Sequence, residues 1–170
     1  MTMLLVHFCS GLGTGLCIAV SQYFGARQER EIKEVIASGF LLAIVLSLLL
    51  TALCFLVAKP VIWGFLQTPE EMRNGSLTYF LIYSGGLIFQ MVYNAAYGVL
   101  RAHGDSRGAS LFLLISSVLN IGLDLLFVMV FQWGIAGAAV ATVISQAGAT
   151  IASLIYLRKL FPDLMPRLSA

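Results

Sequence analysis

The chain has 170 residues, of which 59% are hydrophobic and 11% charged, with a net charge of +2 and a mean hydropathy of +0.93. Because a soluble domain carries about 25% charged residues, this composition excludes a water-soluble globule and predicts an all-α polytopic membrane protein. The small net charge and the scattered basic residues exclude a nucleic-acid-binding surface.

Five apolar stretches are long enough to cross a bilayer, since about 20 residues span the hydrocarbon as a helix. We expect these spans at residues 3–24, 35–58, 77–100, 109–131 and 134–157. All four prolines fall outside them, which supports the boundaries because proline interrupts helices. Residues 1–160 are expected to form one membrane domain, followed by a tail at 161–170.

The basic residues are distributed unevenly between the two ends of these spans. Eight of them lie in the loops 25–34 and 101–108 or after residue 157, whereas two, Lys59 and Arg73, lie on the opposite side. The positive-inside rule therefore predicts a multi-pass protein of the plasma membrane whose two basic loops and C-terminus are cytoplasmic. The first span then begins outside the cell, so a further helix is expected upstream of it.

Asp124 is the one charged residue within a span. An ionised Asp near the centre of a bilayer costs about 2.5–3.5 kcal/mol on insertion scales, so such residues commonly have a function. Asn120 precedes it by one helical turn and shares its face of the helix. The pair either binds a proton or a small alkali cation, which is the interpretation we favour, or forms a structural hydrogen-bonded contact between helices.

Other polar side chains within the spans have two interpretations each. Thr142 and Gln146, four residues apart, form a polar strip beside a row of small residues that permits close helix packing. A lone Thr in a membrane helix commonly donates to its own backbone, which is the alternative to a ligand role. Asn94, which shares a face with Gln90, is either an interhelical hydrogen-bonding group or part of a cation or substrate site.

The turn at residues 101–107 offers an acidic side chain to either of two arginines, and the sequence contains no catalytic motif. Gly104 supplies the turn geometry, and Asp105 is expected to pair with Arg101 or Arg107. No HExxH, GxSxG or paired-carboxylate motif occurs in the sequence. We therefore expect no enzymatic activity, no catalytic residue, no cofactor, and no metal beyond a sodium ion at Asp124.

Several short motifs occur in a fixed order along the chain. They are SQYFGAR at 21–27, TPEE at 68–71, LRAHGDS at 100–106, LNIGLD at 119–124 and GIAGAAVAT at 134–142. With this ordered set, the chain resembles the multidrug and toxic compound extrusion (MATE) transporters over about residues 10–159. The resemblance implies that the five spans are helices two to six of the N-terminal six-helix lobe of a twelve-helix transporter. The first helix and the second lobe would then be missing, or another chain would supply them.

The resemblance also implies a cation site in this lobe. On the pattern of prokaryotic family members, Asp124, Asn120 and Thr142 match cation-site positions, and Asn94 matches a neighbouring polar position. Some relatives carry an amide where this chain has Tyr97, a difference that could alter ion preference. The chain is expected to belong to an antiporter that exchanges a proton or sodium ion for organic, cationic drugs by alternating access.

The expected partners are the lipid bilayer and a small organic substrate. The candidates for the lining of the substrate cavity are Tyr97, Gln90 and Gln146.

Three other functions stay open. The chain could be a non-transporting product, either truncated or a helper subunit, or a flippase of lipid-linked sugars from the same superfamily, or an intramembrane enzyme. A flippase should have a more cationic central cavity, whereas no Lys or Arg lies within a span. An enzyme would need at least two convergent reactive groups.

Overall fold

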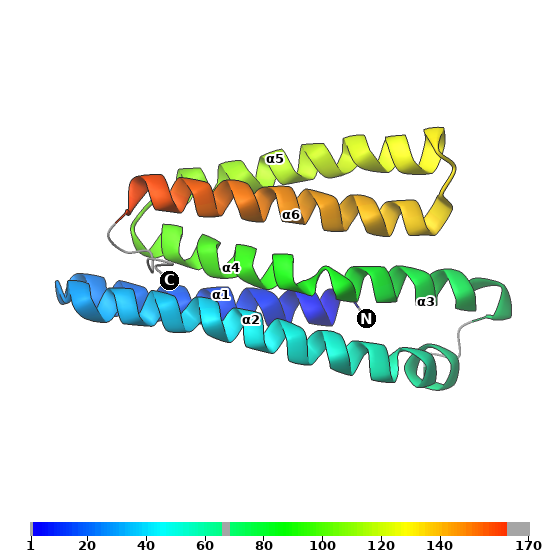
Figure 1. Ribbon diagram of the computed structural model, residues 1–170, viewed down its shortest axis with the longest axis horizontal. Coiled ribbons are helices and arrows are strands. Elements are labelled where there is room, and N and C mark those ends of the chain that lie inside the picture. The colour runs from blue at the N-terminus through cyan, green and yellow to red at the C-terminus, as the bar shows by residue number, and fades with distance from the viewer. Residues whose placement is uncertain (1, 66–68, 163–170) are drawn as a thin grey trace, which may run out of the picture.

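A computed structural model describes residues 2–65 and 69–162, and every regular element in these residues is a helix. In chain order the helices are α1 (Thr2–Gly25), α2 (Glu29–Lys59), η1 (Pro60–Phe65), α3 (Glu70–Gly85), α4 (Leu87–Ala102), α5 (Ser106–Asp124), η2 (Leu125–Val130) and α6 (Gly134–Leu160) (Figure 1). The elements η1 and η2 are π-helical segments that continue α2 and α5. Thr68 of the TPEE motif and residues 163–170 of the expected tail lie outside the described residues.

The helices supply the membrane spans that the composition predicts. Four helical stretches are long and apolar enough to cross a bilayer: Thr2–Gly25, Arg30–Gly64, Ser106–Val130 and Gly134–Leu160. Helices α3 and α4 meet at a break with a bend of 47°, and the pair is apolar enough to count as a fifth span if it crosses the bilayer as one unit. The expected all-α membrane fold is therefore confirmed. The third expected span, 77–100, crosses this bend, which its uniform hydropathy does not indicate.

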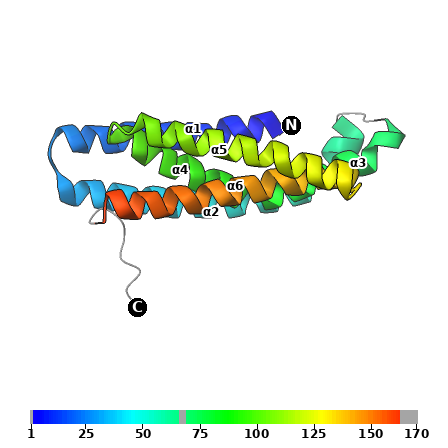
Figure 2. The same ribbon diagram turned by 90° about the horizontal axis from the view of Figure 1, so that it is seen from above.

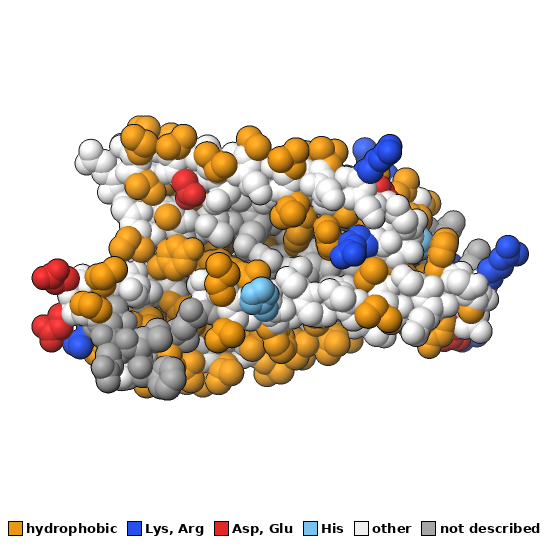
Figure 3. Space-filling model, turned by 180° about the vertical axis from the view of Figure 1, so that it is seen from behind, with side chains coloured by type: hydrophobic (Ala, Val, Ile, Leu, Met, Phe, Trp, Pro, Cys, Tyr) orange, Lys and Arg blue, Asp and Glu red, His pale blue; other side chains and the backbone are white. Residues whose placement is uncertain are grey.

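Helix α4 lies at the centre of the bundle. It packs against α1 and α2 on one side and against α6 on the other, while α5 lies outermost and packs mainly on α6 (Figures 1 and 2). The apolar side chains of α5, such as Leu114, Ile115 and Val118, are exposed. Hydrophobic side chains cover the length of one face of the molecule, with charged ones mainly towards its two ends (Figure 3). This distribution suits a bundle whose long sides contact lipid.

Glycines allow α1 and α4 to approach each other at backbone distance. A Cβ atom built on Gly13 would lie 2.5 Å from the Asn94 carbonyl oxygen, and one on Gly98 would overlap the Gly13 carbonyl oxygen. Helices in lipid gain association energy from close van der Waals packing, which small residues permit. The crossing of α1 and α4 therefore depends on the absence of side chains at these two positions.

The turn between α4 and α5 is attached to the end of α6. Gly104 has a φ of 82°, which glycine adopts without strain. One Asp105 oxygen accepts the Gly108 N–H at 2.9 Å and caps α5, and the other accepts the Tyr156 hydroxyl at 2.9 Å. Within the described residues, no ion pair joins Asp105 to Arg101 or Arg107 as expected from the sequence; the carboxylate instead holds the start of α5 and the Tyr156 hydroxyl.

The basic loops lie at the same end of the bundle. The α1–α2 loop, the α4–α5 turn and the C-terminal end of α6 gather at one end, and η1 and the α5–α6 connection lie at the other (Figure 1). This arrangement is the one that five antiparallel spans with short connections require.

A substitution on α1 tests the α1–α4 crossing. Gly13→Ala should lower the free energy of unfolding by about 1–3 kcal/mol, because its methyl group overpacks the contact with Asn94. Gly15→Ala is the matched control, since no atom lies within 4 Å of a Cβ at Gly15. Thermal unfolding of the purified protein in detergent measures both, and equal melting temperatures would show that the crossing is not tight.

Candidate functional site

The turn between the last two spans sets the height of the polar residues on them. Gln132 and Gly134 adopt φ angles of 53° and 56°, which reverse the chain within a few residues. Helices α5 and α6 therefore run antiparallel, and Asn120 on α5 lies opposite Thr142 on α6. The structure thus brings together two of the residues that the sequence predicts for a cation site.

Thr142 forms hydrogen bonds in two directions. Its hydroxyl donates to the Ala138 carbonyl oxygen at 3.0 Å, and its Oγ1 accepts the Asn120 side-chain amide at 3.4 Å. The first bond is the one that a threonine in a membrane helix commonly makes with its own helix. The second is long for an N–H···O bond and hence weak, so a bound ion could replace it at little cost.

Asp124 is the last residue of α5 and is half-buried. Its Oδ1 atom is buried and has no hydrogen-bond partner within the part of the chain that the structure describes. No hydrogen bond joins it to Asn120 among those residues, although the two lie one helical turn apart. A buried oxygen without a donor costs about 1–3 kcal/mol, and more when it is charged, so this atom is suited to a proton or a cation.

The helix changes form directly after Asp124. Residues Leu125–Val130 are π-helical, and the Phe131 N–H donates to the Leu126 carbonyl oxygen five residues earlier at 3.0 Å. Segments of this kind are rare and occur frequently at functional sites. The aromatic rings of Phe127, Phe131 and Trp133 stack beyond this point, with centroids 5.2–5.9 Å apart.

A polar cavity of about 190 Å³ lies between α4, α5 and α6. Its lining residues come from all three helices: Gln90, Tyr93, Leu113, Ser116, Ser117, Asn120, Thr142, Ser145, Gln146 and Ala149. At about 30 Å³ for each water in the liquid, the space corresponds to about six waters. Asp124 is one helical turn beyond Asn120, the last α5 residue that lines the cavity. The Asn120–Thr142 contact therefore lies in the cavity lining, one helical turn along α5 from the carboxylate.

The serine hydroxyls around the cavity already donate their hydrogens to backbone carbonyls. Ser116 donates to the Ser145 carbonyl oxygen at 3.2 Å, Ser117 to that of Leu113 at 2.9 Å, and Ser145 to that of Ala141 at 2.7 Å. The remaining lone pairs of these hydroxyl oxygens can only accept hydrogen bonds or coordinate a cation. The cavity is therefore rich in acceptors, as a site for a small cation or for water requires.

The other predicted site residues divide between the cavity and elsewhere. Gln90 and Gln146 line it. Asn94 is buried where α4 meets α1, next to Gly13, and its amide donates to the Gln90 carbonyl oxygen at 2.7 Å. Tyr97 lies outside the lining, between the Tyr93 ring and the Arg101 guanidinium. The structure thus does not bring Asn94 or Tyr97 to the Asn120–Thr142 contact.

Sequence reasoning missed Tyr93 and the serines as lining residues. Tyr93 contributes a buried hydroxyl that has no hydrogen-bond partner among the described residues. A signal was present, because Tyr93 follows Gln90 by three residues, and Ser116 precedes Asn120 by four. Both spacings place the residues on one face of their helix.

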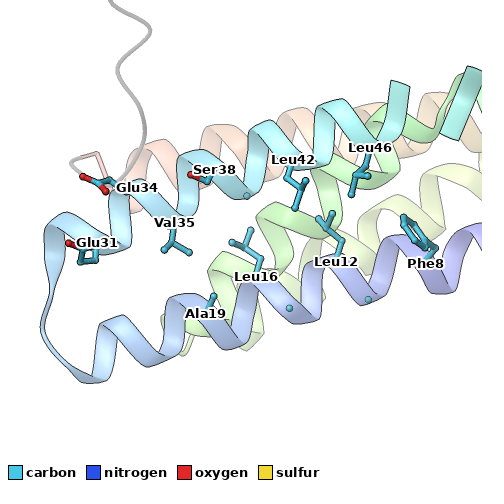
Figure 4. A pocket seen from close by; sticks show the side chains of 13 residues that line it. Phe8, Leu12, Leu16, Ala19, Glu31, Glu34, Val35, Ser38, Leu42 and Leu46 are labelled. Atoms are coloured by element: carbon cyan, nitrogen blue, oxygen red, sulfur yellow. The ribbon is translucent and has the colours of Figure 1, made fainter. Parts of the chain in front are cut away.

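A larger groove of about 790 Å³ separates α1 from α2 (Figure 4). Its walls are mainly apolar, with Leu12 and Leu16 on α1 and Leu42 on α2, and Glu31 and Glu34 lie at its end near the α1–α2 loop. None of the predicted cation or substrate residues lines it. We assign the candidate site to the smaller cavity, because the converging polar groups and the unpartnered oxygen lie there or directly beside it.

Comparison with known proteins gives a consistent family assignment. A family model described as MatE matches residues 1–126. The probable multidrug resistance protein YpnP of Bacillus subtilis (strain 168) is 34% identical over 165 residues, covering 96% of this chain and 37% of that protein. The probable multidrug resistance protein YoeA of the same strain is 31% identical over 160 residues, covering 92% and 34%.

A solved structure gives the same fold. A crystal structure of MATE in complex with MaL6 superimposes with a TM-score of 0.88 at 24% identity, covering 95% of this chain and 36% of that one. The present chain thus spans about a third of the length of the relatives that it matches.

Two substitutions at Thr142 test the contact between α5 and α6. Thr142→Val keeps the volume but removes the acceptor of the Asn120 amide, so the free energy of unfolding should fall by about 1 kcal/mol. Thr142→Ser keeps the oxygen and both hydrogen bonds and should cost less. Thermal unfolding in detergent compares them, and a serine variant no more stable than the valine variant would show that the hydroxyl does not hold Asn120.

Proposed function

The chain belongs to the MATE family of transporters, and from that premise we propose that it forms part of a cation-coupled antiporter for organic compounds. The family match and the apolar helices make it a multi-pass membrane protein of a family that transports rather than catalyses. The names of YpnP and YoeA, both probable multidrug resistance proteins, support the export of drugs or other toxic compounds. Transport by the complete protein would need a second lobe, in the same or another chain.

Asp124 is proposed to take up the coupling ion, which is either a proton or sodium. The observation that carries this proposal is its buried Oδ1, which lacks a hydrogen-bond partner among the described residues. Burying an ionised carboxylate is costly, and a bound proton or sodium ion removes most of that cost. The ion would therefore favour the conformation in which Asp124 is enclosed, and its release would favour an open one.

Asn120 and Thr142 are proposed to complete the ion site. Asn120 lies one turn before Asp124 on α5 and Thr142 lies opposite it on α6, and their weak 3.4 Å contact can open to let their oxygens face a sodium ion. Carboxylate, amide and hydroxyl oxygens are the ligands that a hard cation prefers. Since Asn94 faces α1, we propose that it supports the packing of α4 and does not contact the ion directly.

The polar cavity is proposed to form part of the substrate path. Gln90, Tyr93 and Gln146 would contact a small organic compound, with the free hydroxyl of Tyr93 as a donor. Tyr97 lies outside the present lining. Because α5 packs only loosely against α4, a movement of α5 away from α4 would bring Tyr97 into the path. Alternating access would then couple the ion to the substrate through the packing of α5 and α6.

The basic end of the bundle is proposed to face the cytoplasm of a cell whose plasma membrane holds the protein. The positive-inside rule and the shared end of both basic loops support this orientation.

Neutralising Asp124 tests the proposal. In the complete natural protein that contains this sequence, Asp124→Asn should abolish ion-driven efflux of a cationic dye from proteoliposomes while leaving expression intact, because the amide has neither the negative charge that balances a sodium ion nor a site that takes up a proton. Glu71→Gln is the matched control, since this carboxylate is exposed at the start of α3, far along the chain from the cavity. Wild-type rates in the Asp124→Asn variant, under imposed sodium and proton gradients, would contradict the role of Asp124.

A further inference from the structure

The bend between α3 and α4 occurs at the glycine pair Gly85–Gly86. A side chain at Gly86 would meet other atoms, whereas one at Gly85 would not. Gly86, the residue between the two helices, has a φ of −84° and a ψ of −4°, which any residue can adopt. Backbone freedom therefore does not explain a glycine at this position. The lack of room for a side chain explains the glycine, because α6 lies against the bend.

The close neighbour of Gly86 is Val143 on α6. A Cβ atom on Gly86 would lie 2.6 Å from Val143 Cγ2 and 3.1 Å from Cγ1, distances that real side chains do not tolerate without a shift. In contrast, no atom lies within 4 Å of a Cβ on Gly85. The bend thus receives the Val143 side chain only because residue 86 lacks one of its own.

Side chains from two other helices lie against the backbone on either side of the bend. Thr51 on α2 donates to the Ser84 carbonyl oxygen at 2.9 Å, near the end of α3. The Thr150 hydroxyl on α6 lies 2.9 Å from the Phe89 carbonyl oxygen and 2.7 Å from the Gln146 carbonyl oxygen of its own helix, and its single hydrogen is donated to one of them at a time. The last carbonyls of a helix have no partner within it and no water in lipid, so the bond from Thr51 stabilises the end of α3 at the bend.

Val143 directly follows Thr142 in α6. A shift of Val143 away from the bend would move the adjoining backbone, and with it the Oγ1 atom that accepts the Asn120 amide. That contact is already 3.4 Å long, so a displacement of a few tenths of an ångström would break it.

We infer that Gly86 is a positioning residue for the candidate cation site, because it seats Val143 in the α3–α4 bend and so holds Thr142 at the height of Asn120. The inference rests on the proposed function in that the site is taken to bind the coupling ion. It assigns to the bend a role in ion affinity, in addition to its role in packing.

The experiment compares three variants of the complete natural protein. Gly86→Ala should raise about tenfold the ion concentration that gives half of the ion-dependent increase in melting temperature. This is the size of loss seen when a group supporting a metal ligand is removed. The ion dependence is measured in a sodium chloride series with choline chloride as the balancing salt, and in a pH series. Gly85→Ala, the matched control, should stay within about twofold of the wild type, because its methyl group meets open space.

The double variant Gly86→Ala/Val143→Ala identifies the route of the effect. Removing the two Val143 methyl groups makes room for the new Cβ, so the double variant should recover most of the ion dependence. Equal behaviour of Gly86→Ala and Gly85→Ala, or no recovery in the double variant, would overturn the inference.

Hydrogen exchange of the α6 segment 138–146 separates this outcome from a failure of the proposed function. If the wild type shows no ion dependence in either series, the proposed function fails. Faster exchange in Gly86→Ala than in Gly85→Ala would still support the positioning of Thr142 by the bend, and equal exchange would contradict it.

Discussion

The lack of hydrogen-bonding partners in lipid is the constraint on which this structure depends. Most serine and threonine hydroxyls within the described spans donate to a backbone carbonyl, either in their own helix, as in Thr14 and Ser21, or across to another, as in Thr51. Four buried side-chain atoms of the described residues lack a hydrogen-bond partner, and Asp124 Oδ1 is the one that belongs to a carboxylate, so it requires an explanation. The cation proposed to bind here would explain it, because the ion would supply in one conformation the partner that the protein does not.

Close approaches at glycine connect that site to the rest of the bundle. Gly13 and Gly98 bring α1 against α4, and Gly86 brings the α3–α4 bend against α6. Since α4 contacts α1, α2 and α6, a change in the packing of α6 would be transmitted to both halves of the bundle. Contacts of this kind have little freedom to adapt, so a small change at Thr142 can favour a different arrangement of whole helices.

The sequence predicted the spans and the family more completely than it predicted the site. Length and hydropathy determine which segments cross the bilayer, and the order of short motifs identifies the family. The Asn120–Thr142 contact followed from the family pattern, which helical spacing alone would not have shown. The position of Asn94 was not predictable, since spacing places it on the face of Gln90 while the missing side chain of Gly13 lets α1 pack directly against it. The Gly85–Gly86 pair by itself permits bending or close packing at this point of the sequence, but its neighbour Val143 was not predictable, because Val143 lies on a distant span.

Infrared difference spectroscopy of the protein in lipid tests the central claim most directly, since it reports the state of a single carboxyl group. On addition of sodium or on acidification, the account predicts a change in one buried carboxyl band in the wild type and its absence in the Asp124→Asn variant. The same difference spectrum from both proteins would show that Asp124 does not take up the ion, and would contradict the account.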